Sequence, residues 1–571
     1  MLSTRRIMTK FMVVIPLLLM TIPTTKGADI SPSAQTQQGI YIGRQTTIHG
    51  TNVNYWLGIL YAQAPIGNLR WMPPQALAIS NVTREAYNSV SCHQLYDMGF
   101  PRTEVCLIVN VYAPENANNL PVYVWIHGDA FYAGASLQYD GTPFVSTSII
   151  NSVPVIVVTI NYRLGLLGFM ADKELFEERS GIDNRKTTGN YGILDQIMAL
   201  DWIKKNIAGF GGNPEQITVG GESAGGISTV ILLATSLVPS GTFQRAAVES
   251  GTLWPNQAYP LQTAIHKTGN VLRASTHCTT LQCLRNLTAD QIHAVESILL
   301  VTENGATGIP VIDGYVLDDI IENYYANENL KKMPLLIGST ANETTFITCS
   351  LLNGSATSAQ VQEYFRALYN TTIVDEIPAI YGPISAMPNP LIYLNIVFTN
   401  AWMNCGSRRI TSSFSSYGIP SYLFTYNHLL STTSSCAGAT HSSDLPMLFP
   451  SYLPYFSGGY TFDAIDQQVS TSMMLYWAHF ISSSNPNYNG SPANWDACQQ
   501  SVDNDFVIQF NPYMRNRHYY PTCTGLWDRY AVTNKTITSA ANTYTNKYSY
   551  FLLLFFCFLY LHSNVSIGDI K

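Results

Sequence analysis

Two runs of apolar, β-branched residues restrict the fold of this chain more than any other feature. The segments LPVYVWIHG (120–128) and VPVIVVTINYR (153–163) are hydrophobic without alternation, which is typical of strands buried on both faces of a sheet. LDQIMALDWIKKNI (194–207) carries apolar residues at helical spacing. QITV (216–219) predicts another strand, and AGGISTVILLATSLV (224–238) predicts a buried helix. This alternation predicts an α/β fold with a large, mostly parallel central sheet and helices on both faces.

Length and charge limit the classes of function. The chain has 571 residues, of which 46% are hydrophobic, so it is long enough for one large core, and α/β enzymes of this size are often single units. No internal repeat is present. The net charge is −7, and no basic block or stripe occurs, so we expect no nucleic-acid partner.

The stretch VGGESAGG (219–226) contains the strongest chemical motif. Ser223 stands between a predicted strand and a predicted helix, with glycines on both sides. A sharp turn in this setting lifts a serine hydroxyl above the edge of a sheet, as in a nucleophile elbow. The alternative is a glycine-rich turn that merely contains a serine, and the strand–turn–helix context favours the nucleophile.

The N-terminus predicts export. Basic residues precede an apolar run from Phe11 to Ile22, and small residues follow it, so we expect residues 1–27 to be a cleaved signal peptide. The alternative, an uncleaved membrane anchor, is disfavoured because the run is too short to span a bilayer. A chain in the secretory pathway is open to glycosylation at Asn-x-Ser/Thr sites. The candidate acceptors are Asn81, Asn286, Asn353, Asn370, Asn489 and Asn534.

The ten cysteines are candidates for disulfides in an exported protein. By position, the pairs Cys92 with Cys106, Cys278 with Cys283, and Cys405 with Cys523 are plausible, but spacing alone proves none of them. Three others, Cys349, Cys436 and Cys498, make an odd set, so we expect at least one to be free or to bridge two chains. The sequence has no zinc-site spacing, and we expect neither a metal nor a cofactor.

Four stretches together resemble the type-B carboxylesterase and cholinesterase family of α/β-hydrolases. They are YAQAPIGNLRWMPP (61–74), EVCLIVNVYAP (104–114), NYRLGLLGF (161–169) and TTGNYGILDQIMALDWIKKNIAGFGGNPEQITVGGESAGG (187–226). The resemblance runs collinearly from about residue 40 to about residue 530, so it implies one catalytic domain over 28–533. It also implies the three disulfide pairs just given and a structural salt bridge between Arg70 and Glu104.

The resemblance completes a candidate catalytic triad. A serine hydroxyl needs a base that a third group orients. GATHSSDLPMLF (438–449) resembles the family's histidine loop and implies His441 as the general base, while GSTANETTF (338–346) implies Glu343 as the acid. Ser250 is expected to support Glu343. A glycan on Asn342, beside the proposed acid, would be awkward, so we expect Asn342 to be unmodified.

The oxyanion loop departs from the family pattern. The family usually has His-Gly-Gly-Gly or His-Gly-Gly-Ala here, whereas this chain has HGDAF (127–131). The expected donors are the backbone N–H groups of Asp129, Ala130 and Ala224. The Asp129 carboxylate must turn away, because a negative charge facing the oxyanion raises the barrier. If this position needs a positive φ, aspartate tolerates it better than most residues.

The expected partner is a small-molecule carboxylic ester. The loop CHQLYDMGFPRTEVC (92–106) lacks the tryptophan with which cholinesterases hold choline. NGATG (304–308) is small and polar where cholinesterases carry phenylalanines. Both differences favour a roomier site for general carboxylic esters over one specialised for acetylcholine.

The C-terminal residues 534–571 combine a polar stalk with the apolar run FLLLFFCFLYL (551–561). We expect this run to attach the protein to a membrane, either through a GPI signal or through a stretched transmembrane helix, and a buried C-terminal segment is the alternative. The sequence thus predicts a secreted or cell-surface serine esterase. A catalytically weak or inactive cholinesterase-like adhesion or binding protein is the alternative. The oligomeric state stays open.

Overall fold

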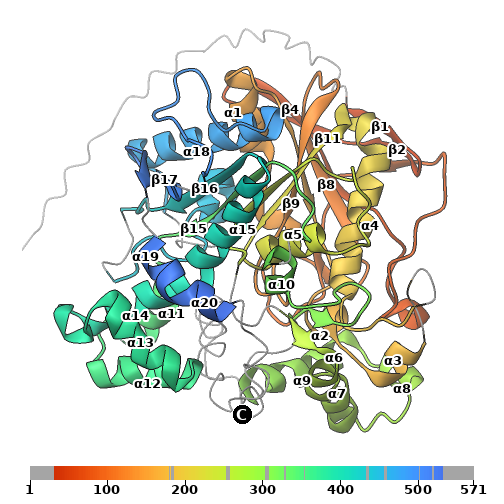
Figure 1. The fold of residues 1–571 in the computed structure, drawn as a ribbon. Coiled ribbons are helices and arrows are strands. Elements are labelled where there is room, and N and C mark those ends of the chain that lie inside the picture. Colours follow the sequence, from red (N-terminus) through yellow and green to blue (C-terminus); the bar gives the residue numbers. More distant parts are fainter. Residues whose placement is uncertain are drawn as a thin grey trace, which may run out of the picture. The chain divides into compact units, whose positions relative to one another are not determined.

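A mixed eleven-stranded sheet forms the centre of the fold (Figure 1). The computed structural model describes residues 31–178, 181, 185–252, 258–302, 308–326, 329–352, 354–431, 436–454, 460–499, 502–516 and 520–531. The predicted signal peptide, the C-terminal stalk with its apolar run, Asn353 and Asn534 lie outside these residues. Most of the 304–308 stretch does too. The residues from Pro32 onward form one unit.

The sheet is parallel in its middle and antiparallel at its edges. All strand pairs from β10 to β17 run parallel, whereas β18 on one side and β8, β4 and β3 on the other are antiparallel. Across the sheet the order is β18 (Tyr513–Asn516), β17 (Asn504–Ile508), β16 (Ser421–Tyr426), β15 (Leu335–Thr340), β12 (Arg245–Glu249), β11 (Gly212–Glu222), β9 (Leu120–Ile126), β10 (Ile156–Ile160), β8 (Ile108–Pro114), β4 (Thr51–Leu60) and β3 (Arg44–Ile48).

Shorter strands and many helices surround this sheet. The minor strands are β1 (Ser33–Thr36), β2 (Gly39–Ile42), β5 (Thr83–Glu85), β6 (Ser91–Cys92), β7 (Arg102–Thr103), β13 (Tyr259–Pro260) and β14 (Val311–Ile312). The helices are α1 (Thr142–Ile150), α2 (Gly165–Phe169), α3 (Lys173–Glu177), α4 (Tyr191–Asn206), α5 (Ala224–Ala234), α6 (Leu261–Lys267), α7 (Gly269–Thr276), α8 (Leu281–Arg285), α9 (Ala289–Thr302), α10 (Ile321–Ala326), α11 (Thr345–Leu351), α12 (Ser358–Leu368), α13 (Thr371–Tyr381), α14 (Pro390–Thr399), α15 (Cys405–Ser416), α16 (Leu445–Leu448), α18 (Ala464–Ser483), α19 (Tyr520–Thr522) and α20 (Asp528–Ala531).

Both faces of the sheet are buried, and strand β9 shows how. Successive side chains of a strand point to opposite faces. Val122 and Val124 belong to the core on the side of α4 and α5, whereas Tyr123 and Trp125 belong to the core on the side of α1 and α18. All four side chains are inaccessible to solvent. The continuous apolar run at 120–128 is therefore explained by helices on both faces, which confirms the predicted α/β class.

The predicted elements are present, and one predicted helix ends early. The strands predicted within 120–128, 153–163 and 216–219 are β9, β10 and part of β11, and the helix predicted at 194–207 is α4. The helix predicted at 224–238 ends at Ala234 instead. Thr235 turns to an extended backbone (φ −63°, ψ 138°), and the Lys331 ammonium donates to carbonyl oxygens at this end, including that of Thr235. A cation that satisfies the last carbonyls favours a helix end.

Four disulfides connect the described residues. Cys92–Cys106, Cys278–Cys283 and Cys405–Cys523 are the pairs that the family resemblance implies. The fourth, Cys349–Cys436, joins two members of the odd set. Cys498 is buried and forms no disulfide with another described cysteine.

Two further predictions concern glycosylation and membrane attachment. Asn81, Asn286 and Asn489 are exposed, while Asn370 is half-buried and its side chain accepts the Ile373 N–H at the start of α13. Within the described ranges, no helix has both the length and the apolar character that crossing a bilayer requires.

Candidate active site

Ser223 occupies a sharp turn between β11 and α5. Its backbone has φ 55° and ψ −121°, and α5 begins at the next residue. The neighbouring glycines allow this turn to pack on β9. A Cβ on Gly221 would lie 2.4 Å from the Ile126 carbonyl oxygen, and a Cβ on Gly225 would lie 1.9 Å from it. The glycines are thus required by close backbone approach, and the hydroxyl stands at the edge of the sheet as in a nucleophile elbow.

His441 and Glu343 form a hydrogen-bonded pair near this turn. The His441 Nδ1 lies 2.5 Å from the Glu343 Oε2. The Glu343 Oε1 accepts the Ser250 hydroxyl at 2.6 Å and the Thr340 N–H at 2.7 Å. All of these groups are buried. Because one carboxylate oxygen is held by two donors, the other keeps a fixed direction toward the imidazole ring.

The pair reaches the serine turn through Glu222, the residue before Ser223. The Glu222 Oε1 lies 3.3 Å from the His441 Nε2, and it accepts the Ser442 hydroxyl at 2.7 Å. Two successive residues of one loop, His441 and Ser442, therefore contact Glu222 at the end of β11. Sequence reasoning did not single out Glu222, although it is part of the VGGESAGG stretch.

The site holds a surplus of buried acid groups. Burial alone would lower the pKa of His441, but the carboxylates of Glu222 and Glu343 outweigh burial and raise it to about 9. Burial raises the pKa of Glu222 to about 8 and that of Asp444 to about 7. Such surroundings favour the imidazolium form of His441, which is the form that a general base takes after accepting a proton.

The loop 127–131 lies beside the serine turn and has an unusual backbone. Three consecutive residues, Asp129, Ala130 and Phe131, have φ of 65°, 54° and 66°. A Cβ on Gly128 would lie 3.1 Å from the Ser223 Cβ, so loop and nucleophile are in contact. Asp129 thus has the positive φ that aspartate tolerates better than most residues, and the left-handed conformation extends over two further residues.

Neighbouring segments hold this loop at both ends. The Tyr162 hydroxyl donates to the His127 carbonyl oxygen at 2.9 Å, and the Gly165 N–H donates to that of Phe131 at 2.8 Å. Within the described part of the chain, the N–H groups of Asp129, Ala130 and Ala224 donate to no protein acceptor. They are the three groups that the sequence predicted as oxyanion donors.

The Asp129 carboxyl lies close to Gly134, which also approaches the His127 ring. A Cβ added to Gly134 would lie 2.8 Å from the Asp129 Oδ2 and 2.5 Å from the His127 Nδ1. The Oδ2 atom is buried and has no hydrogen-bond partner among the described residues. Burial raises the pKa of Asp129 to about 6, against a smaller opposing effect of His441. That the carboxylate turns away from a forming oxyanion stays a prediction.

Two further features near the site were not anticipated. The Phe346 ring stacks on His441 with centroids 5.7 Å apart. The Cys349–Cys436 disulfide links α11, which follows Glu343, to the loop that carries His441. Both cysteines lie close in sequence to the predicted acid and base, which was the available signal. Among the described residues, no three His, Cys, Asp or Glu side chains are arranged so that they could hold a metal ion together.

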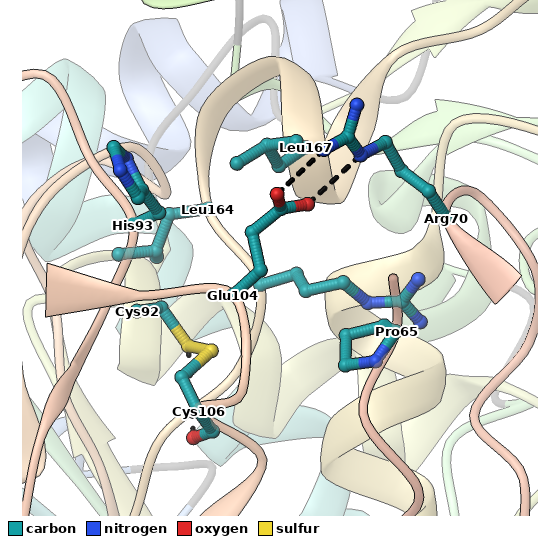
Figure 2. Close-up of a pocket in the computed structure, with 9 residues that line it drawn as sticks. Pro65, Arg70, Cys92, His93, Glu104, Cys106, Leu164 and Leu167 are labelled. Atoms are coloured by element: carbon teal, nitrogen blue, oxygen red, sulfur yellow. Dashed lines mark hydrogen bonds and ion pairs between the residues drawn. A yellow bond between two sulfur atoms is a disulfide. The ribbon is translucent and has the colours of Figure 1, made fainter. Parts of the chain in front are cut away.

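The salt bridge implied by the resemblance is also present. The Arg70 guanidinium contacts both carboxylate oxygens of Glu104, with nitrogen–oxygen distances of 2.5 and 2.8 Å. The pair lies beside the Cys92–Cys106 disulfide and lines a small pocket (Figure 2).

Comparisons with known proteins agree with this architecture. The family model described as "Carboxylesterase family" matches residues 30–527. Human cocaine esterase is 29% identical over 85% of this chain and 89% of its own length, and feline carboxylesterase 5A is 29% identical over 82% and 89%. A solved structure of a PNB esterase aligns with a TM-score of 0.72 at 26% identity, over 86% of this chain and 99% of its own. The fold is that of the α/β-hydrolases, and the chain belongs to the carboxylesterase family.

Proposed function

We propose that this protein is a serine esterase that hydrolyses small carboxylic esters through an acyl-enzyme. In this proposal, Ser223 attacks the ester carbonyl and His441 accepts its proton at Nε2. Glu343 holds the Nδ1–H and stabilises the imidazolium that forms. The N–H groups of Asp129, Ala130 and Ala224 bind the negative oxygen of the tetrahedral intermediate. His441 then returns the proton to the leaving alcohol, and water releases the acyl group by the same steps.

One observation carries the proposal. The Glu343 carboxylate is held by Ser250 on one oxygen and directed at His441 by the other, beside a serine on a strand-to-helix turn. A histidine base needs such a third group to fix its tautomer and orientation.

Hydrolysis of p-nitrophenyl acetate by the purified protein tests the proposal. Ser223→Ala is expected to lower the rate at least a thousandfold, and an organophosphate is expected to label Ser223 stoichiometrically. Ser236→Ala, an exposed serine just beyond α5, is the matched control and should keep the wild-type rate. Equal rates for the wild type and Ser223→Ala would instead support the alternative, a cholinesterase-like adhesion or binding protein.

We also propose that the substrates are general carboxylic esters. The 92–106 loop lacks the tryptophan with which cholinesterases hold a quaternary ammonium group. The kcat/KM for p-nitrophenyl butyrate should therefore exceed that for butyrylthiocholine. A clear preference for the choline ester would contradict this substrate class.

We propose export to the secretory pathway on separate grounds. Four described disulfides favour an oxidising compartment, and three sequons are exposed. In a eukaryotic expression host, the mature protein should begin at Ala28 and lose mass on treatment with an N-glycosidase. An intact Met1 together with no loss of mass would contradict export.

A further inference from the structure

A second buried carboxylate lies outside the proposed triad. Glu296, on α9, is inaccessible to solvent. Its Oε1 accepts the Leu166 N–H at 3.0 Å, at the start of α2, and its Oε2 lies 2.6 Å from the His293 Nδ1. A Cβ on Gly165 would lie 2.0 Å from the Oε1, so the backbone leaves room for this carboxylate only because residue 165 is glycine.

Two histidines extend this contact to the first disulfide loop. The His293 Nε2 lies 3.0 Å from the Nδ1 of His93, which directly follows Cys92. The two ring planes are within 15° of each other, with centroids 5.0 Å apart. A carboxylate only accepts hydrogen bonds, so the His293 Nδ1 donates to Glu296. The Nε2 of a neutral His293 then accepts from the His93 Nδ1–H. With a neutral His293, both hydrogen bonds in the chain Glu296–His293–His93 are therefore donated toward the carboxylate.

The start of α2 also holds the oxyanion loop. The Gly165 N–H donates to the Phe131 carbonyl oxygen, and the Phe131 ring packs edge-on against Phe169 of α2 with centroids 5.1 Å apart. The adjacent N–H, that of Leu166, is the group that Glu296 accepts. The N–H of Gly165 thus holds the oxyanion loop, and the N–H of the next residue, Leu166, holds Glu296.

A small apolar cluster supports the same connection. Tyr132 and Ala133, which follow the oxyanion loop, pack with Leu300 of α9 and with Leu95 of the disulfide loop. His93 of the disulfide loop and Leu164, just before α2, also line the pocket that contains the Arg70–Glu104 salt bridge (Figure 2). The oxyanion loop, α2, α9 and the disulfide loop therefore meet in one place.

We propose that Glu296 is a positioning residue for the oxyanion loop, and that His293 and His93 hold its carboxylate in place. The inference rests on the proposed esterase function, because it concerns the loop that would bind the tetrahedral intermediate. Three consecutive left-handed residues are intrinsically unfavourable without glycine, so this loop depends on contacts that fix its ends. Glu296 fixes the backbone turn on which Phe131 is anchored.

The proposal predicts an effect on transition-state binding with little effect on substrate binding. An oxyanion donor acts on the charge that develops during reaction, so its misplacement lowers kcat and leaves KM nearly unchanged. Kinetics are measured with p-nitrophenyl butyrate, per active site titrated with an organophosphate. The affinity for a trifluoromethyl ketone, which forms a tetrahedral adduct, is measured in parallel.

Four variants make the test. Glu296→Leu removes both acceptors at similar volume and should lower kcat at least tenfold. His93→Leu should lower kcat at least threefold, and His93→Asn should restore it to within twofold of the wild type, because an asparagine amide can replace the Nδ1–H donor. Asp290→Asn is the control. Asp290 is 89% exposed, and its carboxylate lies 3.8 Å from the outer nitrogen of His93, so its kcat should stay within twofold.

The expected result is a parallel change in kcat and in trifluoromethyl ketone affinity, with KM within twofold. The inference is overturned if His93→Leu keeps the wild-type kcat, if His93→Asn fails to restore a loss, or if only KM changes. Should Glu296→Leu fail to fold, the two His93 variants decide the question alone. A wild-type rate in Ser223→Ala overturns the proposed function and this inference together. An inactive Ser223→Ala with an unaltered His93→Leu overturns only the inference.

Discussion

Asparagine in place of Asp129 keeps the shape of the side chain and removes its charge. The Asp129 Oδ2 is buried without a hydrogen-bond partner among the described residues, and burial raises the pKa of this carboxyl from its ordinary 3.8 to about 6. A group with a raised pKa in the folded state opposes folding once it ionises. We therefore expect Asp129→Asn to stabilise the protein at neutral and alkaline pH.

The size of the effect follows from the two pKa values. A shift of one pKa unit between the unfolded and the folded state corresponds to about 1.4 kcal/mol of stability. The rise of the Asp129 pKa from 3.8 to about 6 therefore costs the folded state at most about 3 kcal/mol. This cost is absent below pH 3.8, where the carboxyl is protonated in both states. It grows as the pH rises between the two values and is fully present above about pH 6.

Urea unfolding followed by tryptophan fluorescence at pH 4 and at pH 8 measures this effect. Asp129→Asn should have nearly the wild-type free energy of unfolding at pH 4 and exceed it by up to about 3 kcal/mol at pH 8. Asp129→Gly should add about 1 kcal/mol at pH 4, since glycine relieves the left-handed backbone. At pH 8 it should add up to about 4 kcal/mol, since it also removes the buried charge. The exposed Asp290→Asn is the control. Equal stabilisation of Asp129→Asn at both pH values would refute the electrostatic argument, and no stabilisation at pH 8 would refute the raised pKa.

Three shorter predictions concern the proposed triad. Ser250→Ala removes a donor to Glu343 and should lower kcat about tenfold, the equivalent of ~1.4 kcal/mol, in steady-state assays. The kcat/KM of the wild type should rise with pH until His441, whose pKa is raised to about 9, has lost its proton. Glu222→Gln removes one of the two carboxylates that raise this pKa, so the rise of kcat/KM should move to lower pH. The double change Cys349→Ser and Cys436→Ser removes a disulfide that spans 87 positions, so it should cost roughly 4 to 5 kcal/mol of stability. Urea unfolding measures this loss, and an unchanged unfolding midpoint would contradict the prediction.

Local sequence was sufficient for the nucleophile and its strands. The runs that became β9 and β10 are apolar because both faces of the sheet are covered. The glycines around Ser223 are required because the turn lies against the Ile126 carbonyl of β9. In each case the residue types in one short segment indicate the structure, although the contacts that impose them are distant in sequence.

Distant contacts explain what sequence reasoning missed. Helix α5 ends at Ala234 where Lys331 meets its last carbonyls, and nothing in 224–238 announces that lysine. The Cys349–Cys436 pair depends on the distance between two loops, which spacing does not give. Glu343 and His441 were found through resemblance, because a lone glutamate or histidine in a loop has no local mark of its role.

The oxyanion loop depends both on its local sequence and on distant contacts. The sequence HGDAF shows that a glycine position has become aspartate, and physical chemistry predicts a strained backbone there. The sequence does not show which contacts offset the strain. These are the Tyr162 hydroxyl on the His127 carbonyl and the Gly165 N–H on that of Phe131. Because left-handed residues relax unless their ends are fixed, a substitution in α2 should disturb this loop more than one at an exposed position nearer to Ser223.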